Sequence, residues 1–234
     1  MTRRAVIAGA TGEVGRQLAA RLATEPEWEV RALVRRPGVL PETSGLTEVP
    51  FDFEDAAAFD RLFAAPCDLL LIALGTTRAK AGSDAAFLRV DRDYPLRLIQ
   101  ALARFHPKAA VGLVSSVGAD QPRGLYLQAK AAVEAGLAAS GLTHAIARPS
   151  LLRSRRVEVR PLEVAMDRLV APGMLALGRV WFPRSRAWWR WAPVHVREVA
   201  TALLAATLAL EPGQRRVLEG LDLHPGPIAH WGEP

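Results

Sequence analysis

Short apolar runs alternate along this chain with longer segments in which apolar side chains recur at every third or fourth position. Continuous apolar runs bounded by turn residues are typical of buried strands, and the longer spacing is typical of helices with one buried face. We predict strands near residues 4–9, 28–34, 46–51, 68–74, 109–115, 142–148 and 215–219. We predict helices near residues 13–24, 55–64, 84–105, 124–140, 161–171 and 196–210.

The order of these elements, strand and helix in turn with short connections, favours parallel β-α-β units. Such units build an α/β fold with a doubly wound parallel sheet, whose ligands bind at the carboxyl ends of the strands. At 234 residues the chain suits a single domain that covers residues 1–234.

The pattern loosens from about residue 150 onward, where prolines recur at short intervals and tryptophans gather between Trp181 and Trp191. We expect residues of about 150–214 to form a small C-terminal substrate lobe. We interpret the tryptophan cluster as part of the core or of an oligomer interface. A lid over an apolar substrate and a contact with a membrane surface are the less favoured interpretations.

The composition of the chain mainly argues against certain classes of protein and site. The net charge of +6 comes from arginines scattered among acidic residues, without a basic tail, which argues against nucleic-acid binding. Cys67 is the single cysteine, so a disulfide framework is excluded and a reducing cytoplasm fits. The histidines are dispersed and offer no metal-ligand spacing.

No signal peptide is visible, and the longest apolar runs are too short for a membrane span. We therefore expect a cytoplasmic protein without an integral membrane segment and without a metal ion. We expect it to act on a small-molecule substrate as a monomer or a small homo-oligomer.

A glycine-rich turn follows the first predicted strand, and a helical pattern follows that turn. Glycine permits a tight turn and lets a ligand approach the backbone closely. A helix N-terminus presents free N–H groups and a partial positive charge, which suits the pyrophosphate of a dinucleotide. The glycine spacing is G-x-x-G-x-x-G, and we expect the pyrophosphate of the cofactor to bind at this loop, where Gly9 and Thr11 precede the helix.

The second predicted strand, residues 28–34, is followed directly by Arg35 and Arg36. Folds that bind NAD usually place an acidic residue here for the ribose 2′-hydroxyl, whereas an Arg accommodates the 2′-phosphate of NADP. Arginine binds phosphate through forked, charge-assisted hydrogen bonds. The sequence therefore predicts NADP(H) as the cofactor, bound in part by these two arginines.

Tyr126 and Lys130 lie four residues apart in the predicted helix 124–140, so they share one face of that helix. A free phenol holds its proton too tightly for acid–base work at neutral pH, and a cation beside it favours the phenolate. The pair is thus a candidate proton-transfer device. Ser115 and Ser116 end the preceding strand, where either hydroxyl can hydrogen-bond a substrate carbonyl.

Together these motifs resemble the short-chain dehydrogenases/reductases. A closer similarity is to the Tat-interacting-protein oxidoreductase branch of the atypical reductases, and it extends over essentially the whole chain. The segments that carry it are Gly75-Thr76-Thr77-Arg78, Arg89-Val90-Asp91-Arg92-Asp93-Tyr94, Ser115-Ser116-Val117-Gly118-Ala119-Asp120, Leu125-Tyr126-Leu127-Gln128-Ala129-Lys130 and Arg148-Pro149.

The resemblance implies an NADPH-binding Rossmann protein in which Tyr126 is the acid–base residue. It implies that Lys130 binds the nicotinamide ribose and tunes Tyr126, and that Ser115 or Ser116 orients the substrate carbonyl. It also places a further set of residues near the cofactor: Gly12, Glu13, Val14, Gly15, Arg35, Leu74, Gly75, Leu152 and Arg160. We expect Thr76, which follows Gly75, to contact the cofactor as well. One departure is that the chain contains no Asn, and Asp91 stands where extended relatives often carry one.

Three functional hypotheses follow. The first is an NADPH-dependent oxidoreductase that reduces a carbonyl or an activated double bond, with Tyr126 as the proton donor. The second is an NADP(H)-binding protein that senses redox state and docks a partner, but such a protein has no need of the Tyr126–Lys130 pair. The third is a nucleotide-sugar epimerase, which the short C-terminal portion disfavours.

Overall fold

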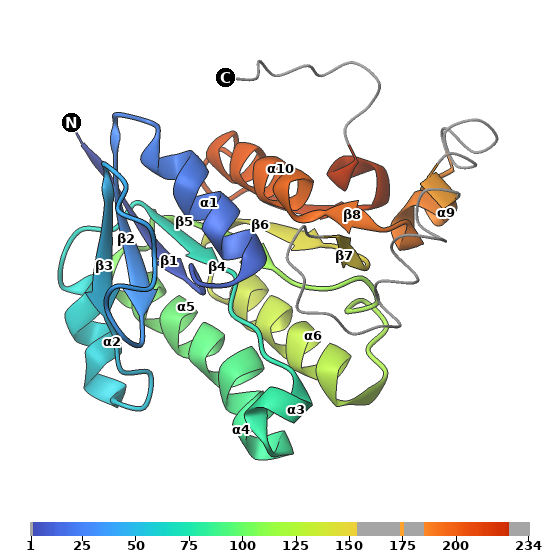
Figure 1. Cartoon of the computed structure of the whole chain (residues 1–234), viewed down its shortest axis with the longest axis horizontal. Helices are drawn as coiled ribbons and strands as arrows, with labels where there is room; N and C mark the ends of the chain where they lie inside the picture. Colours follow the sequence, from blue (N-terminus) through green and yellow to red (C-terminus); the bar gives the residue numbers. More distant parts are fainter. Residues whose placement is uncertain (1, 154–173, 176–184, 225–234) are drawn as a thin grey trace.

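A sheet of seven parallel strands forms the centre of the molecule in the computed structural model, which describes residues 2–153, 174–175 and 185–224 (Figure 1). The strand order is β3-β2-β1-β4-β5-β6-β9, and each neighbouring pair is parallel. The predicted doubly wound sheet is therefore confirmed. The strands are β1 (Arg3–Ala8), β2 (Trp28–Val34), β3 (Leu46–Pro50), β4 (Leu69–Ile72), β5 (Ala110–Val114), β6 (Thr143–Arg148) and β9 (Arg215–Glu219).

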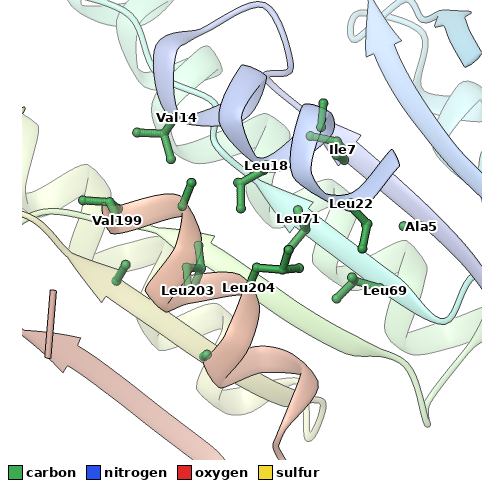
Figure 2. Close-up of a cluster of buried hydrophobic side chains, with 14 of the residues drawn as sticks. Ala5, Ile7, Val14, Leu18, Leu22, Leu69, Leu71, Val199, Leu203 and Leu204 are labelled. Atoms are coloured by element: carbon green, nitrogen blue, oxygen red, sulfur yellow. The ribbon is translucent and has the colours of Figure 1, made fainter. Parts of the chain in front are cut away.

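Helices cover both faces of this sheet. On one face lie α1 (Glu13–Ala23) and α10 (Val196–Leu208), and on the other lie α2 (Ala56–Phe63), α5 (Tyr94–Phe105) and α6 (Gly124–Ala139) (Figure 1). Side chains alternate between the faces along a strand, so Ile7 packs under α1 while its neighbour Val6 packs toward α5. Figure 2 shows the first core, where leucines of α1 and α10 meet above β1 and β4.

The predicted helix 84–105 is divided into three parts: α4 (Asp84–Leu88), a π-helical turn (Arg89–Asp93) and α5. Pro95 lies in the first turn of α5 and has no N–H to return to the preceding turn, so the regular ladder cannot continue there. π-Helical turns are frequent at functional sites. In this one, the wider turn buries the side chain of Asp91, which is 1% exposed.

The remaining described elements are short. β7 (Leu152–Arg153) and β8 (Val194–His195) form a separate parallel pair, and α9 (Arg186–Trp191) precedes β8. The other two are α3 (Arg78–Ala81) and the 3₁₀ helix Gly220–Leu223. The predicted helix 161–171, Arg160 and Trp181 lie outside the described residues. Trp189 is buried, whereas Trp191 is 59% exposed.

None of the helices in the described ranges has both the length and the apolar character that crossing a bilayer requires.

Candidate functional site

The glycine loop between β1 and α1 is shaped by close backbone contacts. Gly9 has a positive φ of 93°, and a Cβ there would lie 2.4 Å from the carbonyl oxygen of Ala73, just beyond β4. A Cβ on Gly15 would lie 2.1 Å from the carbonyl oxygen of Gly9. Both positions therefore need glycine so that the loop can pack against itself and against β4.

Gly12 differs from these two glycines. A Cβ there would come no closer than 3.3 Å to another part of the chain, and its φ of −76° suits any residue. Gly12 is the N-cap of α1 and gives no side-chain cap, so the first N–H groups of the helix stay open to a ligand. The loop thus forms a cradle that a side chain on Gly12 would fill, which fits the pyrophosphate of a dinucleotide.

Val14 and Thr11, near Gly12, differ in what they can offer a ligand. The side chain of Val14 is buried in the core under α1, so it can offer a ligand only its backbone. Thr11 is exposed, and its carbonyl accepts a hydrogen bond of 3.0 Å from Arg16 Nε. Sequence reasoning did not single out Arg16, although a cation one turn into α1 was visible in the sequence.

Arg35 and Arg36 lie exposed at the carboxyl end of β2, next to this loop. Within the described part of the chain, neither guanidinium forms an ion pair or a hydrogen bond. The loop that follows them is held by Glu48 of β3, which accepts hydrogen bonds from the N–H groups of Gly38, Val39 and Leu40 at 2.5, 2.9 and 2.6 Å.

The hydrogen bond from Leu40, together with those from Gly38 and Val39, lowers the pKa of the Glu48 carboxyl below its ordinary value. This carboxylate is thereby directed to the loop backbone and leaves the two arginines available to a phosphate. Glu48 was missed by sequence reasoning because its partners are backbone groups, which leave no mark in the residue pattern.

Tyr126 and Lys130 lie on one face of α6, as the spacing predicts. Lys130 Nζ is 5.8 Å from the centroid of the Tyr126 ring, within cation–π reach. Tyr126 is 44% exposed, so its phenol is accessible to a substrate. The ring of Phe87 in α4 lies 6.3 Å from the Tyr126 ring, centroid to centroid, and is tilted to it by 49°.

The ammonium of Lys130 is buried and engaged. Its Nζ donates to the carbonyl oxygen of Leu74 at 3.4 Å and lies 2.9 Å from Asp91 Oδ1. The other oxygen of Asp91, Oδ2, accepts a hydrogen bond of 2.8 Å from the N–H of Thr76. Asp91 therefore joins the segment after β4 to the helix that carries Tyr126.

The two serines have different surroundings. Ser115 is buried, and its Oγ donates to Glu134 Oε1 at 2.5 Å. Ser116 is only partly buried, and its Oγ makes one long contact of 3.4 Å with the carbonyl of Val117. The hydroxyl of Ser116 is thus the less committed of the two.

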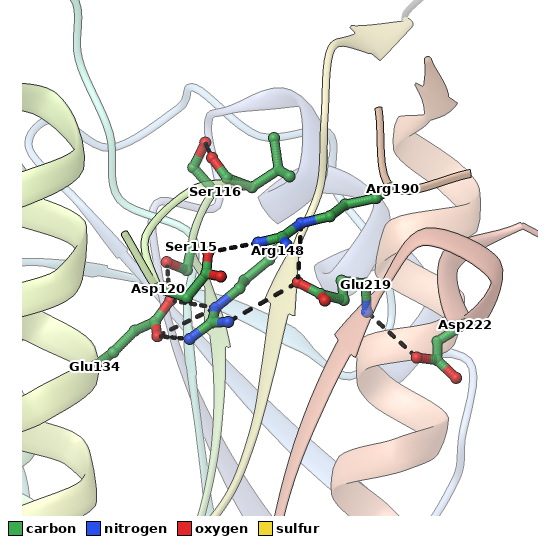
Figure 3. A network of polar contacts seen from close by, with 9 residues as sticks. Ser115, Ser116, Asp120, Glu134, Arg148, Arg190, Glu219 and Asp222 are labelled. Atoms are coloured by element: carbon green, nitrogen blue, oxygen red, sulfur yellow. Dashed lines mark hydrogen bonds and ion pairs between the residues drawn. The ribbon is translucent and has the colours of Figure 1, made fainter. Parts of the chain in front are cut away.

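Glu134 also binds Arg148 at the end of β6, with Nη2 to Oε2 at 2.6 Å and Nε to Oε1 at 3.1 Å (Figure 3). Their side chains are 10% and 16% exposed. The hydrogen bond to Glu134 raises the pKa of Arg148 above its ordinary value. Glu134 lies one turn beyond Lys130, so Tyr126, Lys130 and Glu134 follow one another along the same face of α6.

This network continues to the C-terminal part of the fold. Arg148 Nη1 lies 3.8 Å from Glu219 Oε2 of β9, and Arg190 Nε of α9 lies 3.7 Å from the same oxygen (Figure 3). Arg190 Nη2 binds Asp120 Oδ1 at 2.5 Å, and this hydrogen bond lowers the pKa of Asp120. The loop that carries the serines is therefore tied to both α9 and β9.

The remaining residues expected near the cofactor follow the ends of β4 and β6. Gly75 lies beside the ion pair, since a Cβ there would be 3.6 Å from Asp91 Oδ1 and 3.9 Å from Lys130 Nζ. The N–H of Thr76 is taken by Asp91, so only its side chain and carbonyl remain for a ligand. Leu152 is 36% exposed in β7.

A separate hollow of about 530 Å³ lies at the opposite edge of the sheet, where β4, β5 and β6 begin. Ligands of doubly wound sheets bind at the carboxyl edge, so we do not assign the site to this hollow. Cys67 borders it, but burial raises the pKa of its thiol to about 12, which keeps the sulfur protonated. In the described ranges, no group of three or more His, Cys, Asp or Glu side chains is arranged to hold a metal ion.

Comparison with known proteins finds one matching family model and several similar sequences. A family model described as NAD(P)H-binding matches residues 9–168. The chain is 35% identical over 162 residues to Protein HTATIP2 of Rattus norvegicus. This aligned region covers 67% of this chain and 66% of the rat protein. It is 33% identical over 180 residues to Protein fmp52, mitochondrial, of Emericella nidulans, covering 74% of this chain and 75% of the fungal protein.

Solved structures share the fold at lower identity. The oxidoreductase ylbE from Lactococcus lactis has a TM-score of 0.63 and 18% identity, covering 91% of this chain and 88% of that chain. The Bordetella bronchiseptica enzyme WbmH, whose crystal structure is a complex with NAD⁺, has a TM-score of 0.68 and 17% identity, covering 93% and 74%. At these identities the likeness speaks for the fold alone.

Proposed function

Because this chain belongs to the NAD(P)H-binding family and has the Rossmann fold, we propose that it is an NADPH-dependent oxidoreductase that reduces a carbonyl group or an activated double bond. Bound NADPH would supply the hydride. The residues of this chain would bind the cofactor and the substrate, and they would deliver the proton.

One observation carries this proposal: the proton-transfer pair and the phosphate cradle lie at the same carboxyl edge of the sheet. Lys130 Nζ reaches the carbonyl of Leu74 beyond β4, and Gly9 packs against the neighbouring carbonyl of Ala73. A dinucleotide that enters at Gly12 and crosses this edge would therefore extend toward Lys130 and Tyr126.

Tyr126 would donate its phenolic proton to the carbonyl oxygen whose carbon accepts the hydride, or, for an activated double bond, to the carbon that does not accept it. The buried ammonium of Lys130 holds the nicotinamide ribose and lies close to the Tyr126 ring. Ser116 hydrogen-bonds the substrate oxygen, while Ser115 positions the strand end through Glu134. The exposed phenol of Tyr126 and the weakly held hydroxyl of Ser116 support this division of roles.

We further propose that Arg35 and Arg36 bind the 2′-phosphate, so that NADPH is preferred over NADH. Two exposed guanidiniums, without a carboxylate partner in the described residues, support this preference. Gly9, Thr11, Gly12, Glu13, Val14 and Gly15 would cradle the pyrophosphate. Leu74, Gly75, Thr76, Leu152 and Arg160 would line the rest of the cofactor site, and residues of about 150–214 would form the wall against the substrate.

The experiment that tests the function measures NADPH oxidation against a panel of carbonyl compounds and conjugated enones. Thermal stabilisation by NADPH and by NADH is measured in parallel. Turnover of at least one substrate, with stronger stabilisation by NADPH, is the expected result. If neither NADPH nor NADH stabilises the protein, the proposal is overturned.

A second candidate is an NADP(H)-binding regulatory protein that docks a partner. The engagement of Lys130 by Asp91 and Leu74 favours it, because the ammonium is directed partly away from Tyr126. Cofactor-induced stabilisation without turnover on the whole panel would move this candidate ahead.

We propose a cytoplasmic protein that acts as a monomer or a small homo-oligomer. The Emericella nidulans relative is named as mitochondrial, so cell fractionation is the direct test of the location. Size-exclusion chromatography with light scattering tests the oligomeric state.

A further inference from the structure

Asp91 is a buried charge that the proposed chemistry does not use. It lies in the π-helical turn, is 1% exposed, and its carboxylate contacts Lys130 Nζ at 2.9 Å and the N–H of Thr76 at 2.8 Å. Asp91 Oδ1 receives no well-aligned hydrogen bond within the described residues, so its contact with Lys130 is an ion pair. Burying a carboxylate is costly unless a counter-charge and hydrogen bonds compensate it, and here Lys130 and the N–H of Thr76 do so.

The ammonium of Lys130 has three N–H donors. One of them donates to the carbonyl of Leu74, and the contact with Asp91 is an ion pair without an aligned hydrogen bond, so the ammonium keeps donor capacity for a ligand. The buried Lys130 ammonium and the buried Asp91 carboxylate together carry no net charge. The next charged residue along this face of α6, Glu134, is itself balanced by Arg148.

This ion pair belongs to the nicotinamide half of the proposed cofactor site. In a doubly wound sheet, each half of the sheet binds one mononucleotide. The half that contains β1 and β2 carries the glycine loop and Arg35, whereas the ion pair lies beyond β4 in the other half. A nicotinamide ring is cationic when oxidised and neutral when reduced, so an uncompensated ammonium beside it would selectively weaken binding of the oxidised form.

We propose that Asp91 is a positioning residue and a counter-charge, which holds Lys130 in place and lets the site accept the oxidised as well as the reduced cofactor. This inference rests on the proposed function, since it assumes that the nicotinamide binds beside Lys130. Asp91 thus sets the ratio of the affinities for NADP⁺ and NADPH. The affinity for NADPH itself depends mainly on other residues.

The test is Asp91→Asn, which removes the charge but keeps an oxygen for the N–H of Thr76. Dissociation constants for NADP⁺ and NADPH are measured by calorimetry on the purified full chain. The ratio of the NADP⁺ constant to the NADPH constant should rise about tenfold, since a nearby unit charge loses its compensating partner. The NADPH constant should change little.

Asp93→Asn is the matched control, because Asp93 lies in the same π-helical turn but is partly exposed, with a side chain 32% accessible, and pairs with Arg92. It removes the same charge two residues away, where water screens it, and should leave the ratio unchanged. Lys130→Gln should weaken both forms but lower the ratio below that of the parent protein. The double variant Asp91→Asn/Lys130→Gln should bring the ratio back toward the parent value.

A ratio in Asp91→Asn within twofold of the parent value, with both cofactors still bound, would overturn the inference and leave the proposed function intact. If Asp91→Asn does not fold, the ratio in Lys130→Gln decides, and an unchanged ratio there also overturns the inference. Failure of the parent protein to bind either cofactor would overturn the proposed function and, with it, the role of Asp91.

Discussion

At the scale of single residues, Arg35 is expected to set the cofactor preference. Its exposed guanidinium lies at the end of β2 beside the glycine loop. A hydrogen bond to a charged group contributes about 1.5–3 kcal/mol, so Arg35→Ala should weaken NADPH roughly ten- to a hundredfold. Binding of NADH should barely change, because NADH has no 2′-phosphate.

Calorimetric titration with both cofactors measures this effect. Arg216→Ala, which removes an exposed arginine from β9, is a control that should leave both affinities unchanged. Equal affinities of the parent protein for NADPH and NADH would contradict the assignment of the phosphate to these arginines.

Tyr126 is expected to be the proton donor. Tyr126→Phe removes one oxygen from a side chain that is 44% exposed, so the fold should be unaffected. General acid catalysis contributes about 10²–10⁴-fold, and turnover of a carbonyl substrate should fall by about that factor. NADPH affinity should hardly change. A variant that retains more than about half of the parent rate, when chemistry limits turnover, would show that another group supplies the proton.

The two serines should separate into a structural and a catalytic residue. Ser116→Ala should lower turnover by about 10²–10³-fold, the usual loss for one oxyanion donor, with little change in stability. Ser115→Ala should instead lower stability, because Glu134 loses a buried donor. Urea unfolding and steady-state kinetics on both variants provide the test, and the reverse pattern would exchange the two assignments.

At the scale of one element, substitutions at two glycines of the loop between β1 and α1 are expected to have different effects, one on cofactor binding and the other on stability. Gly12→Val adds a side chain where only the carbonyl of Gly9, 3.3 Å away, limits the space, so the protein should fold but lose NADPH-induced stabilisation. Gly15→Ala brings a Cβ to 2.1 Å from that carbonyl and forces the backbone apart. Overpacking of this kind costs about 1–3 kcal/mol, so Gly15→Ala should unfold at a lower temperature without ligand.

Thermal melts with and without NADPH distinguish these outcomes. If Gly12→Val keeps the full stabilisation by NADPH, the pyrophosphate does not lie at the N-terminus of α1.

At the scale of the whole molecule, the Glu134–Arg148 pair should stabilise the carboxyl edge of the sheet. It joins α6 to β6, and through Glu219 and Arg190 it reaches β9 and α9. Without Glu134, Arg148 keeps only the longer contact of 3.8 Å with Glu219. Removing one partner of a buried pair costs about 3–5 kcal/mol, so Glu134→Ala should lower the free energy of unfolding by up to about that amount.

The exposed pair Arg104–Asp60 is the matched comparison, with side chains 62% and 46% exposed. Asp60→Ala should cost less than about 1 kcal/mol, because water screens a surface pair. Urea unfolding of both variants gives the two values. Equal losses would mean that the buried network adds nothing beyond an ordinary surface contact.

Much of the fold was readable from local patterns. All seven predicted strands end within two residues of the observed bounds, and those at 28–34 and 215–219 agree in full with β2 and β9. The central helices were predicted equally well, apart from the π-helical turn at Arg89–Asp93, which the regular spacing of apolar residues in 84–105 concealed. Apolar spacing records which face of an element is buried, and that information is local.

The candidate site divides in the same way. The sequence by itself determined the glycine loop, the arginines after β2 and the Tyr126–Lys130 spacing, because each depends on neighbours in one loop or one turn of helix. Only the tertiary structure decided that Ser115 binds Glu134, 19 residues away, and that Lys130 reaches the carbonyl of Leu74, 56 residues away. It also decided that Asp120 meets Arg190 across 70 residues. Such contacts depend on which strands lie side by side and where each helix crosses them, and hydrogen bonds to a distant backbone leave no periodic pattern in the chain.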